Sequence, residues 1–234
     1  FVLTGYEHFF ADAMIFDHKD FMVINKPAGI VTHPASENSP DIAVSDLVVA
    51  QYPEIALVGQ LNRPGIVHRL DKETSGLLLI ARNVRAYEIF TKLFFDRAIK
   101  KTYVALVKGH PEKSGMVTAP ISRNVYNPCI MTTKRLDGRQ AHTDYTVLRY
   151  FDKHSLVELV PQTGRTHQIR VHMEHEGFPI VADALYGQQS KHDNRLIRRH
   201  ALHAHKLDFV FDGQSYSFVS PVPDDMLKFI AQIS

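Results

Sequence analysis

The nine residues from His68 to Gly76, HRLDKETSG, form a polar turn that runs directly into an apolar run, Leu77–Ala81. The apolar run is typical of a strand, so the turn places one carboxylate, Asp71, at a strand edge. A basic pair, His68 and Arg69, precedes this carboxylate, and a small, hydroxyl-rich Thr-Ser-Gly stretch follows it. A carboxylate beside a cation, with nothing bulky in front of it, suits attack on a substrate better than support of the fold.

Strand patterns occur along the whole chain. They are short apolar or alternating runs bounded by turn residues, and they lie at Phe21–Asn25, Thr102–Val107, Gln140–Leu148, Ser155–Val160, His205–Phe211 and Ser215–Val219. Asp212-Gly213 separates the last two runs and is a strong hairpin signal.

Helical patterns are fewer. We expect helices at Ile42–Tyr52, after a cap at Asn83, at Thr166–Glu176 before Gly177, and after Pro223. The helix after Asn83 has apolar residues at helical spacing, namely Ala86, Ile89, Phe90, Leu93 and Phe94. In the terminal helix we expect Met226, Leu227, Ile230 and Ile233 to face inward. Without regular βαβ alternation, the pattern predicts an α+β fold with a mixed, mostly antiparallel sheet.

Composition sets limits on the class of protein. The 234 residues are 44% hydrophobic and 22% charged, as in an ordinary globular protein with a substantial core. No run of about 18 apolar residues occurs, so we expect no membrane span. The start, FVLTGYEHFF, does not resemble a signal peptide. The single Cys129 cannot form an internal disulfide, which favours a reducing, cytoplasmic setting.

Charge is distributed unevenly. The net charge is only +2, which is weak support for a nucleic-acid partner. Two stretches are locally basic, however, and a local basic face can bind phosphates. One contains Lys191, Arg195, Arg198, Arg199 and Lys206 with a single acid, Asp193. The other contains Arg82, Arg85, Lys92, Arg97, Lys100 and Lys101 with Glu88 and Asp96. Taken alone, each cluster is better explained as a solvated surface.

The HRLDKETSG string resembles the signature of the pseudouridine synthases, in particular the RluA-like family that modifies ribosomal and transfer RNA. Further segments follow that family's order, from about Phe21 to Pro223. They are VINKPAGIVTH (from Val23), KKTYVALVKG (from Lys100), GRTHQIRVHM (from Gly164) and ALHAH (from Ala201). One departure is Ala182-Asp183, where the family often has Gly-Asp; we expect this change in a turn to leave the chemistry untouched.

The resemblance implies a bent central sheet in two lobes with the active site in the cleft between them. It predicts an N-terminal extension over residues 1–20 and one catalytic domain of two lobes over residues 21–234, without an S4-type RNA-binding domain. It also implies the conversion of uridine to pseudouridine in structured RNA. That reaction is redox-neutral, so we expect no cofactor and no metal. We expect a monomer with RNA as its partner.

Three residues are expected to carry the chemistry. The resemblance makes Asp71 the catalytic carboxylate, and Tyr103 the base that takes the C5 proton and stacks on the uracil. Arg170 would pair with the Asp71 carboxylate and keep it ionised.

Seven residues are expected to contact RNA. Arg69 would enter the RNA and hold the target nucleotide out of the stack, and Leu202 would pack near the flipped base, although a core position explains that leucine equally well. The full set is Lys26, His68, Arg69, Arg165, Arg198, Arg199 and Leu202.

Three alternatives remain open. The target could be transfer RNA, although large-subunit ribosomal RNA is favoured. The protein could be a non-catalytic RNA-binding or ribosome-assembly factor, which the presence of Asp71, Tyr103 and Arg170 argues against. The histidine groups 167, 172, 175 and 200, 203, 205 could form a metal-dependent hydrolase site, but the single cysteine and the lack of HExxH disfavour it.

Overall fold

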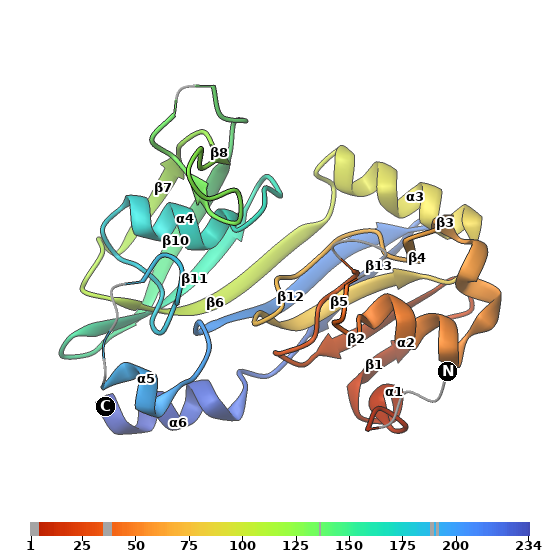
Figure 1. Cartoon of the computed structure of the whole chain (residues 1–234), viewed down its shortest axis with the longest axis horizontal. Coiled ribbons are helices and arrows are strands. Elements are labelled where there is room, and N and C mark those ends of the chain that lie inside the picture. Colours follow the sequence, from red (N-terminus) through yellow and green to blue (C-terminus); the bar gives the residue numbers. More distant parts are fainter. Residues whose placement is uncertain (1–4, 35–38, 136, 188–189, 191) are drawn as a thin grey trace. The chain divides into compact units, whose positions relative to one another are not determined.

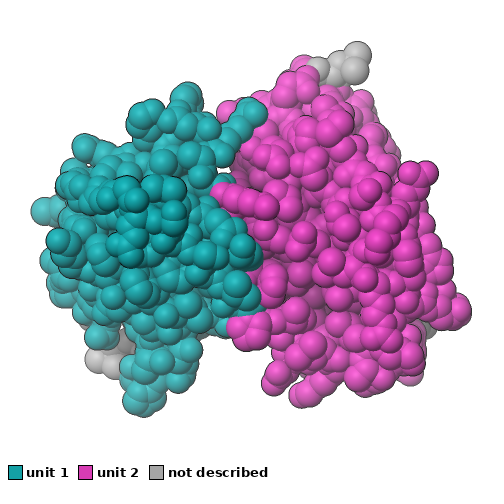
Figure 2. Space-filling view, turned by 180° about the vertical axis from the view of Figure 1, so that it is seen from behind, with its two compact units in different colours: residues 1–99, 206–220 teal, residues 100–205, 221–234 magenta. Residues whose placement is uncertain are grey.

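The computed structural model describes residues 5–34, 39–135, 137–187, 190 and 192–234. The chain divides into two compact units, coloured in Figure 2. Unit 1 comprises residues 1–99 and 206–220, and unit 2 comprises residues 100–205 and 221–234. Lys191, from one of the basic stretches, lies outside the described residues. Among the described residues, no helix is long and apolar enough to cross a membrane.

Unit 1 carries the strand order β1-β2-β5-β12, with β13 paired to β12 (Figure 1). Its strands are β1 Met14–Asp17, β2 Phe21–Lys26, β3 Gly59–Gln60, β4 Arg63–Pro64, β5 Ser75–Ala81 and β13 Gln214–Val219. Its helices are α1 Phe9–Ala13, α2 Val44–Gln51, the 3-10 helix Pro53–Leu57 and α3 Val84–Phe95. Residues 5–20, expected as an extension, contain α1 and β1, and β1 pairs antiparallel with β2.

Unit 2 carries the order β12-β6-β11-β10-β7. Its strands are β6 Lys100–Lys108, β7 Ser114–Thr118, β8 Ser122–Arg123, β9 Met131–Thr132, β10 His142–Tyr150 and β11 His154–Pro161. Its helices are α4 Gln168–His175, α5 Asp193–Leu196 and α6 Asp224–Ile233. β12, Leu202–Phe211, belongs to both units, with residues 202–205 in unit 2 and the remainder in unit 1. The fold is α+β with a mostly antiparallel sheet, as the sequence predicts.

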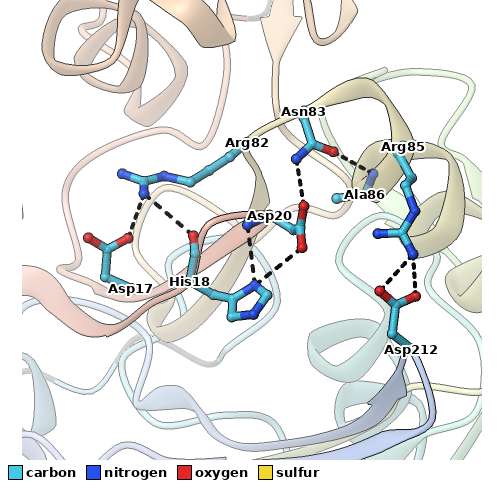
Figure 3. Close-up of polar contacts among 8 residues, drawn as sticks. All are labelled: Asp17, His18, Asp20, Arg82, Asn83, Arg85, Ala86 and Asp212. Atoms are coloured by element: carbon cyan, nitrogen blue, oxygen red, sulfur yellow. Dashed lines mark hydrogen bonds and ion pairs between the residues drawn. The ribbon is translucent and has the colours of Figure 1, made fainter.

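Polar contacts fix the start of α3 in unit 1 (Figure 3). Asn83 caps the helix, because its Oδ1 accepts the Ala86 N–H at 2.9 Å. Its Nδ2 donates to Asp20 Oδ1 at 2.9 Å, which ties the cap to the turn before β2. Arg85, the second residue of the helix, donates to both carboxylate oxygens of Asp212 in the β12–β13 turn, each at 2.6 Å. These contacts hold the turn before β2 and the β12–β13 turn against the start of α3.

Aromatic packing forms the core beneath α3. The Phe90 ring stacks on Phe211 at 4.9 Å and meets Phe21 and Phe209 edge-on at 5.3 and 5.4 Å. Such offset and edge-on pairs add to the free energy gained from burial. The helix, β2 and β12 are therefore joined through one aromatic cluster.

One expected core assignment is wrong. Leu227 of α6 is 48% exposed, whereas Phe229 is fully buried and packs edge-on against His154. Met226 and Phe229 are three positions apart and so share one face of the helix. Ile230 and Ile233 are partly buried and also pack against the core, so the other three expected positions face inward and Phe229 replaces Leu227.

Candidate functional site

Asp71 lies in unit 1 in the turn between β4 and β5, half-buried, and its neighbours are held by backbone contacts. Thr32 fixes Leu70 twice: its Oγ1 donates to Leu70 O at 2.7 Å and accepts the Leu70 N–H at 3.1 Å. On the other side of Asp71, Lys72 O accepts the Gly29 N–H at 2.9 Å. The turn closes on itself, since Thr74 N–H donates to Asp71 O at 3.1 Å. Residues 29–32 therefore hold the backbone on both sides of the carboxylate.

Lys26 completes this support. Its side chain has no exposed surface. Its Nζ donates to Pro27 O at 2.8 Å, Ile30 O at 2.9 Å and Lys72 O at 3.1 Å. An ammonium buried among carbonyls cannot meet a phosphate, so the prediction that Lys26 contacts RNA is corrected: it holds the turn that carries Asp71.

His68 and Arg69 differ in exposure. His68 Nε2 accepts the Leu79 N–H at 2.9 Å, and its ring stacks on Phe94 of α3 at 4.7 Å. A backbone N–H can only donate, so Nε2 carries a lone pair and the ring proton sits on Nδ1. His68 thus joins the signature segment to β5 and α3, while the Arg69 side chain is exposed. RNA contact by either residue stays a prediction.

Tyr103 lies on β6 of unit 2, opposite Leu159 of β11, and is half-buried at the edge of the unit's core. Lys101 is two residues earlier, so it shares a face of the strand with Tyr103. Burial lowers the pKa of Lys101. Its Nζ lies 3.9 Å from where a Cβ at Gly164 would stand, on the loop that leads into α4. The loop and β6 therefore meet beside Tyr103.

Arg170 on α4 is buried and binds a carboxylate that the sequence analysis missed. Its Nε donates to Asp183 Oδ2 at 2.7 Å and its Nη2 donates to Asp183 Oδ1 at 2.9 Å. Asp183 Oδ1 also accepts the N–H groups of Leu185 and Tyr186, at 3.0 and 3.1 Å. Burial alone would raise the Asp183 pKa, but the Arg170 hydrogen bonds and charge outweigh it and hold that pKa below its usual range. The expected pairing of Arg170 with Asp71 stays a prediction.

Tyr186 is the second residue that sequence reasoning missed. The Arg170 guanidinium carbon lies 5.0 Å from the centre of its ring. Its Oη is 2.7 Å from Nδ1 of His167, the residue before α4, and accepts the Met131 N–H at 2.8 Å. The sequence signal for these residues is the Ala182-Asp183 departure, which the sequence analysis considers only as a change in a turn without effect on the chemistry.

The remaining predicted RNA contacts fall into two groups. Arg198 is exposed, and Arg165 is half-buried with its Nε donating to Gln140 O at 3.2 Å. Leu202 is buried in the core of unit 2, which agrees with the core alternative. Arg199 is also buried: its Nε and Nη2 donate to Asp225 at 2.6 and 2.9 Å. The prediction that Arg199 contacts RNA is therefore corrected, because it anchors α6.

The histidine groups do not form a recognisable metal centre. Within the described ranges, no three His, Cys, Asp or Glu side chains gather as a group that could hold a metal ion. His172, fully buried, uses both ring nitrogens on protein groups, Thr143 Oγ1 at 2.9 Å and Ala119 O at 3.1 Å. Burial lowers its pKa, which suits a neutral structural histidine.

Comparison with known proteins gives a consistent result. Residues 20–175 match the family described as RNA pseudouridylate synthase. An uncharacterized RNA pseudouridine synthase of Chloroflexus aurantiacus is 43% identical over 211 residues, covering 89% of this chain and 65% of that protein. Ribosomal large subunit pseudouridine synthase D of Zymomonas mobilis is 37% identical over 223 residues, covering 91% of this chain and 70% of that protein. The chain thus spans about two thirds of the length of these two relatives.

Solved structures agree. Human RNA pseudouridylate synthase domain containing 4 superposes with a TM-score of 0.76 at 25% identity, over 95% of this chain and 93% of that one. Human RNA pseudouridylate synthase domain containing 1 gives a TM-score of 0.73 at 29% identity, over 89% of this chain and 82% of that one. The segment that matches the family, residues 20–175, includes Asp71, Tyr103 and Arg170. This chain belongs to the RNA pseudouridylate synthase family.

Proposed function

We propose that this protein isomerises uridine to pseudouridine in structured RNA, with Asp71 as the catalytic carboxylate. The observation that carries the proposal is the support of the Asp71 turn: Thr32 and Gly29 bond the backbone on both sides of it, and the buried Lys26 bonds Lys72 O, within the segment that matches the family. A carboxylate on a turn fixed in this way is ready to attack without reorganisation.

Uridine and pseudouridine are isomers, so the reaction adds and removes no atoms overall. The bond from ribose C1′ to uracil N1 breaks, a new bond from C1′ to C5 forms, and the proton at C5 leaves while N1 gains one. Asp71 engages the sugar or base in the first step. Tyr103 takes the C5 proton in the last step. In this scheme Arg170, which Asp183 holds, pairs with the Asp71 carboxylate.

Large-subunit ribosomal RNA is the substrate we favour, and we infer that the protein acts as a monomer. The support for ribosomal RNA is the name of the Zymomonas relative, a ribosomal large subunit pseudouridine synthase. Transfer RNA is the second candidate. A uridine inside a helix cannot present its glycosidic bond, so Arg69 would hold the target outside the stack.

The test uses RNA that carries tritium at C5 of every uridine, because that hydrogen is lost to water when pseudouridine forms. We expect release from ribosomal RNA fragments and none after Asp71→Asn, whose amide fits the same space but is not a nucleophile. Asp212→Asn is the matched control, because Asp212 lies in the β12–β13 turn and pairs with Arg85. More than a few per cent of wild-type release by Asp71→Asn would remove Asp71 from the mechanism. Release from transfer RNA alone would move the substrate to the second candidate.

Tyr103→Phe separates the two roles proposed for Tyr103, stacking on the uracil and taking the C5 proton. The ring still stacks, but the hydroxyl is lost, so RNA affinity should survive while product formation falls sharply. If Phe is as active as Tyr and only Tyr103→Ala is inactive, stacking alone is the role of Tyr103.

A further inference from the structure

A hairpin of unit 2 is seated on the helix that carries Arg170. The hairpin spans residues 121–133, where β8 pairs antiparallel with β9. Figure 1 shows it beside α4. Two contacts seat it: the Met131 N–H donates to Tyr186 Oη at 2.8 Å, and Thr133 Oγ1 lies 3.1 Å from His175 Nδ1. Its tip is solvent-exposed, with Tyr126 94% exposed.

Arg170 is held from two directions by one turn. Asp183 bonds the edge of the guanidinium with both carboxylate oxygens, and the Tyr186 ring faces the guanidinium at 5.0 Å. The same turn joins the two, because Asp183 Oδ1 accepts the Tyr186 N–H. It closes tightly at Gly187, where a Cβ would stand only 2.6 Å from Asp183 O. The position of the Tyr186 ring therefore bears directly on the orientation of Arg170.

The Tyr186 hydroxyl connects these two features. The Met131 N–H can only donate, so Tyr186 Oη accepts from it and its own hydrogen is available for a lone pair on His167 Nδ1 at 2.7 Å. His167 has a left-handed backbone, φ 56°, directly before α4. One hydroxyl thus bridges the hairpin and the residue that opens the helix of Arg170.

We propose that Tyr186 is a positioning residue that couples the seating of hairpin 121–133 to the orientation of Arg170. When the hairpin is seated on Oη, the ring is fixed against the guanidinium; when the hairpin lifts, the ring loses one of its anchors. The proposal rests on the proposed function, in which Arg170 serves the catalytic carboxylate. It predicts that loosening the hairpin lowers the catalytic rate through this hydroxyl.

The chain supplies its own reporter for the hairpin. Cys129 is the single cysteine of the sequence, and it is exposed within the hairpin. A nitroxide attached to it reports hairpin mobility by electron paramagnetic resonance. Tyr186→Phe should increase the label's mobility and lower the single-turnover rate on the order of ten-fold, with RNA affinity within about two-fold, because two hydrogen bonds are lost and the ring remains. Tyr150→Phe is the control: it removes a hydroxyl bonded to Pro111 O at 2.9 Å, also in unit 2, and should change neither readout.

A double-mutant cycle isolates the coupling. Thr133→Ala loosens the hairpin at its other contact, on His175. It should lower the rate in the wild-type background and cause no further loss in the Tyr186→Phe background, because the route to Arg170 is already cut. A purely structural role for Tyr186 would make the two losses add.

Three results would overturn the inference. One is a mobile label in Tyr186→Phe with an unchanged rate, which separates the hairpin from catalysis. The second is a reduced rate with an immobile label, which makes Tyr186 act on Arg170 without the hairpin. The third is additive losses in the cycle. A wild-type protein inactive on every RNA tested would instead overturn the proposed function and the catalytic half of this inference, while label mobility would still decide whether Tyr186 seats the hairpin.

Discussion

Replacing Lys26 by Met tests whether the buried ammonium is what holds the Asp71 turn. The methionine side chain is one atom shorter and fills nearly the same apolar space, but it cannot donate a hydrogen bond. The Ile30 carbonyl loses this donor in the protein interior, and the carbonyl of the exposed residue Pro27 loses it at the surface. The Lys72 carbonyl keeps the Gly29 N–H. Lys26→Met therefore removes the ammonium donor from the carbonyls of Pro27 and Ile30, while the Lys72 carbonyl loses one of two hydrogen bonds.

The cost follows from these contacts. A buried carbonyl without a partner costs about 1–3 kcal/mol, which applies to Ile30; Pro27 is an exposed residue, so the loss at its carbonyl costs less. Removing the ammonium also removes its desolvation cost, which is up to several kcal/mol for a buried ion and offsets part of the loss. We expect Lys26→Met to lower the free energy of unfolding by about 2 kcal/mol. Because Lys72 adjoins Asp71, the rate of tritium release should fall as well.

Urea unfolding and the tritium assay measure the two effects, with Lys72→Met as the matched control. The Lys72 ammonium makes a similar contact at the surface, with Asp41 at 2.9 Å, and both side chains are nearly half exposed. A surface pair of this kind contributes less than about 1 kcal/mol. If Lys26→Met is as stable and as active as Lys72→Met, the ammonium does not hold the turn and our account of the site is wrong.

Three further predictions concern two basic groups whose pKa burial lowers, His172 and Lys101, and the exposed Arg198. Burial lowers the His172 pKa, so below about pH 6.5 the unfolded state binds a proton that the folded state does not. The free energy of unfolding should therefore decrease as the pH is lowered through this range, by up to about 1.4 kcal/mol per pH unit. In His172→Gln this decrease should be less steep. Burial likewise lowers the Lys101 pKa, so between that value and about 10.4 stability should rise with pH, and Lys101→Met should remove this rise in thermal unfolding. Arg198→Ala should reduce the salt slope of RNA binding by about one, whereas Arg199→Ala should lower the unfolding midpoint; an unchanged slope would make Arg198 an ordinary surface residue.

Elements with a local signal could be predicted from the sequence. The Asn83 cap, the β10–β11 pair and the hairpin at Asp212-Gly213 are all present. In that hairpin both turn residues have positive φ, 50° and 78°, which is the backbone that Asp-Gly accommodates. Each of these signals lies in a few adjacent residues, so no tertiary contact is needed to recognise it.

Residues whose role depends on distant partners were misjudged. Lys26 looked like an RNA contact because it is a cation in a family motif, and Arg199 because it lies in a basic stretch. Each is instead buried, Lys26 against backbone carbonyls and Arg199 against a carboxylate. Lys26 reaches a carbonyl 46 positions along the chain, and Arg199 reaches a carboxylate 26 positions away. A sequence gives the charge of a side chain but not whether the fold buries it. A basic residue can therefore contact the substrate or stabilise the fold, and the sequence alone does not distinguish the two.

The turn at Ala182 shows how such support can tolerate a departure from the family pattern. Ala182 has φ 56°, a left-handed backbone that costs an alanine about 1–2 kcal/mol and a glycine almost nothing. Alanine recovers about 0.4–1 kcal/mol, because the unfolded chain has less freedom than with glycine. The net cost is therefore about 0–1.6 kcal/mol. Two charge-assisted hydrogen bonds from Arg170 to Asp183 offset this cost, and each contributes about 1.5–3 kcal/mol. The carboxylate that fixes Arg170 therefore holds the turn in its strained shape, and alanine is acceptable where the family often has glycine.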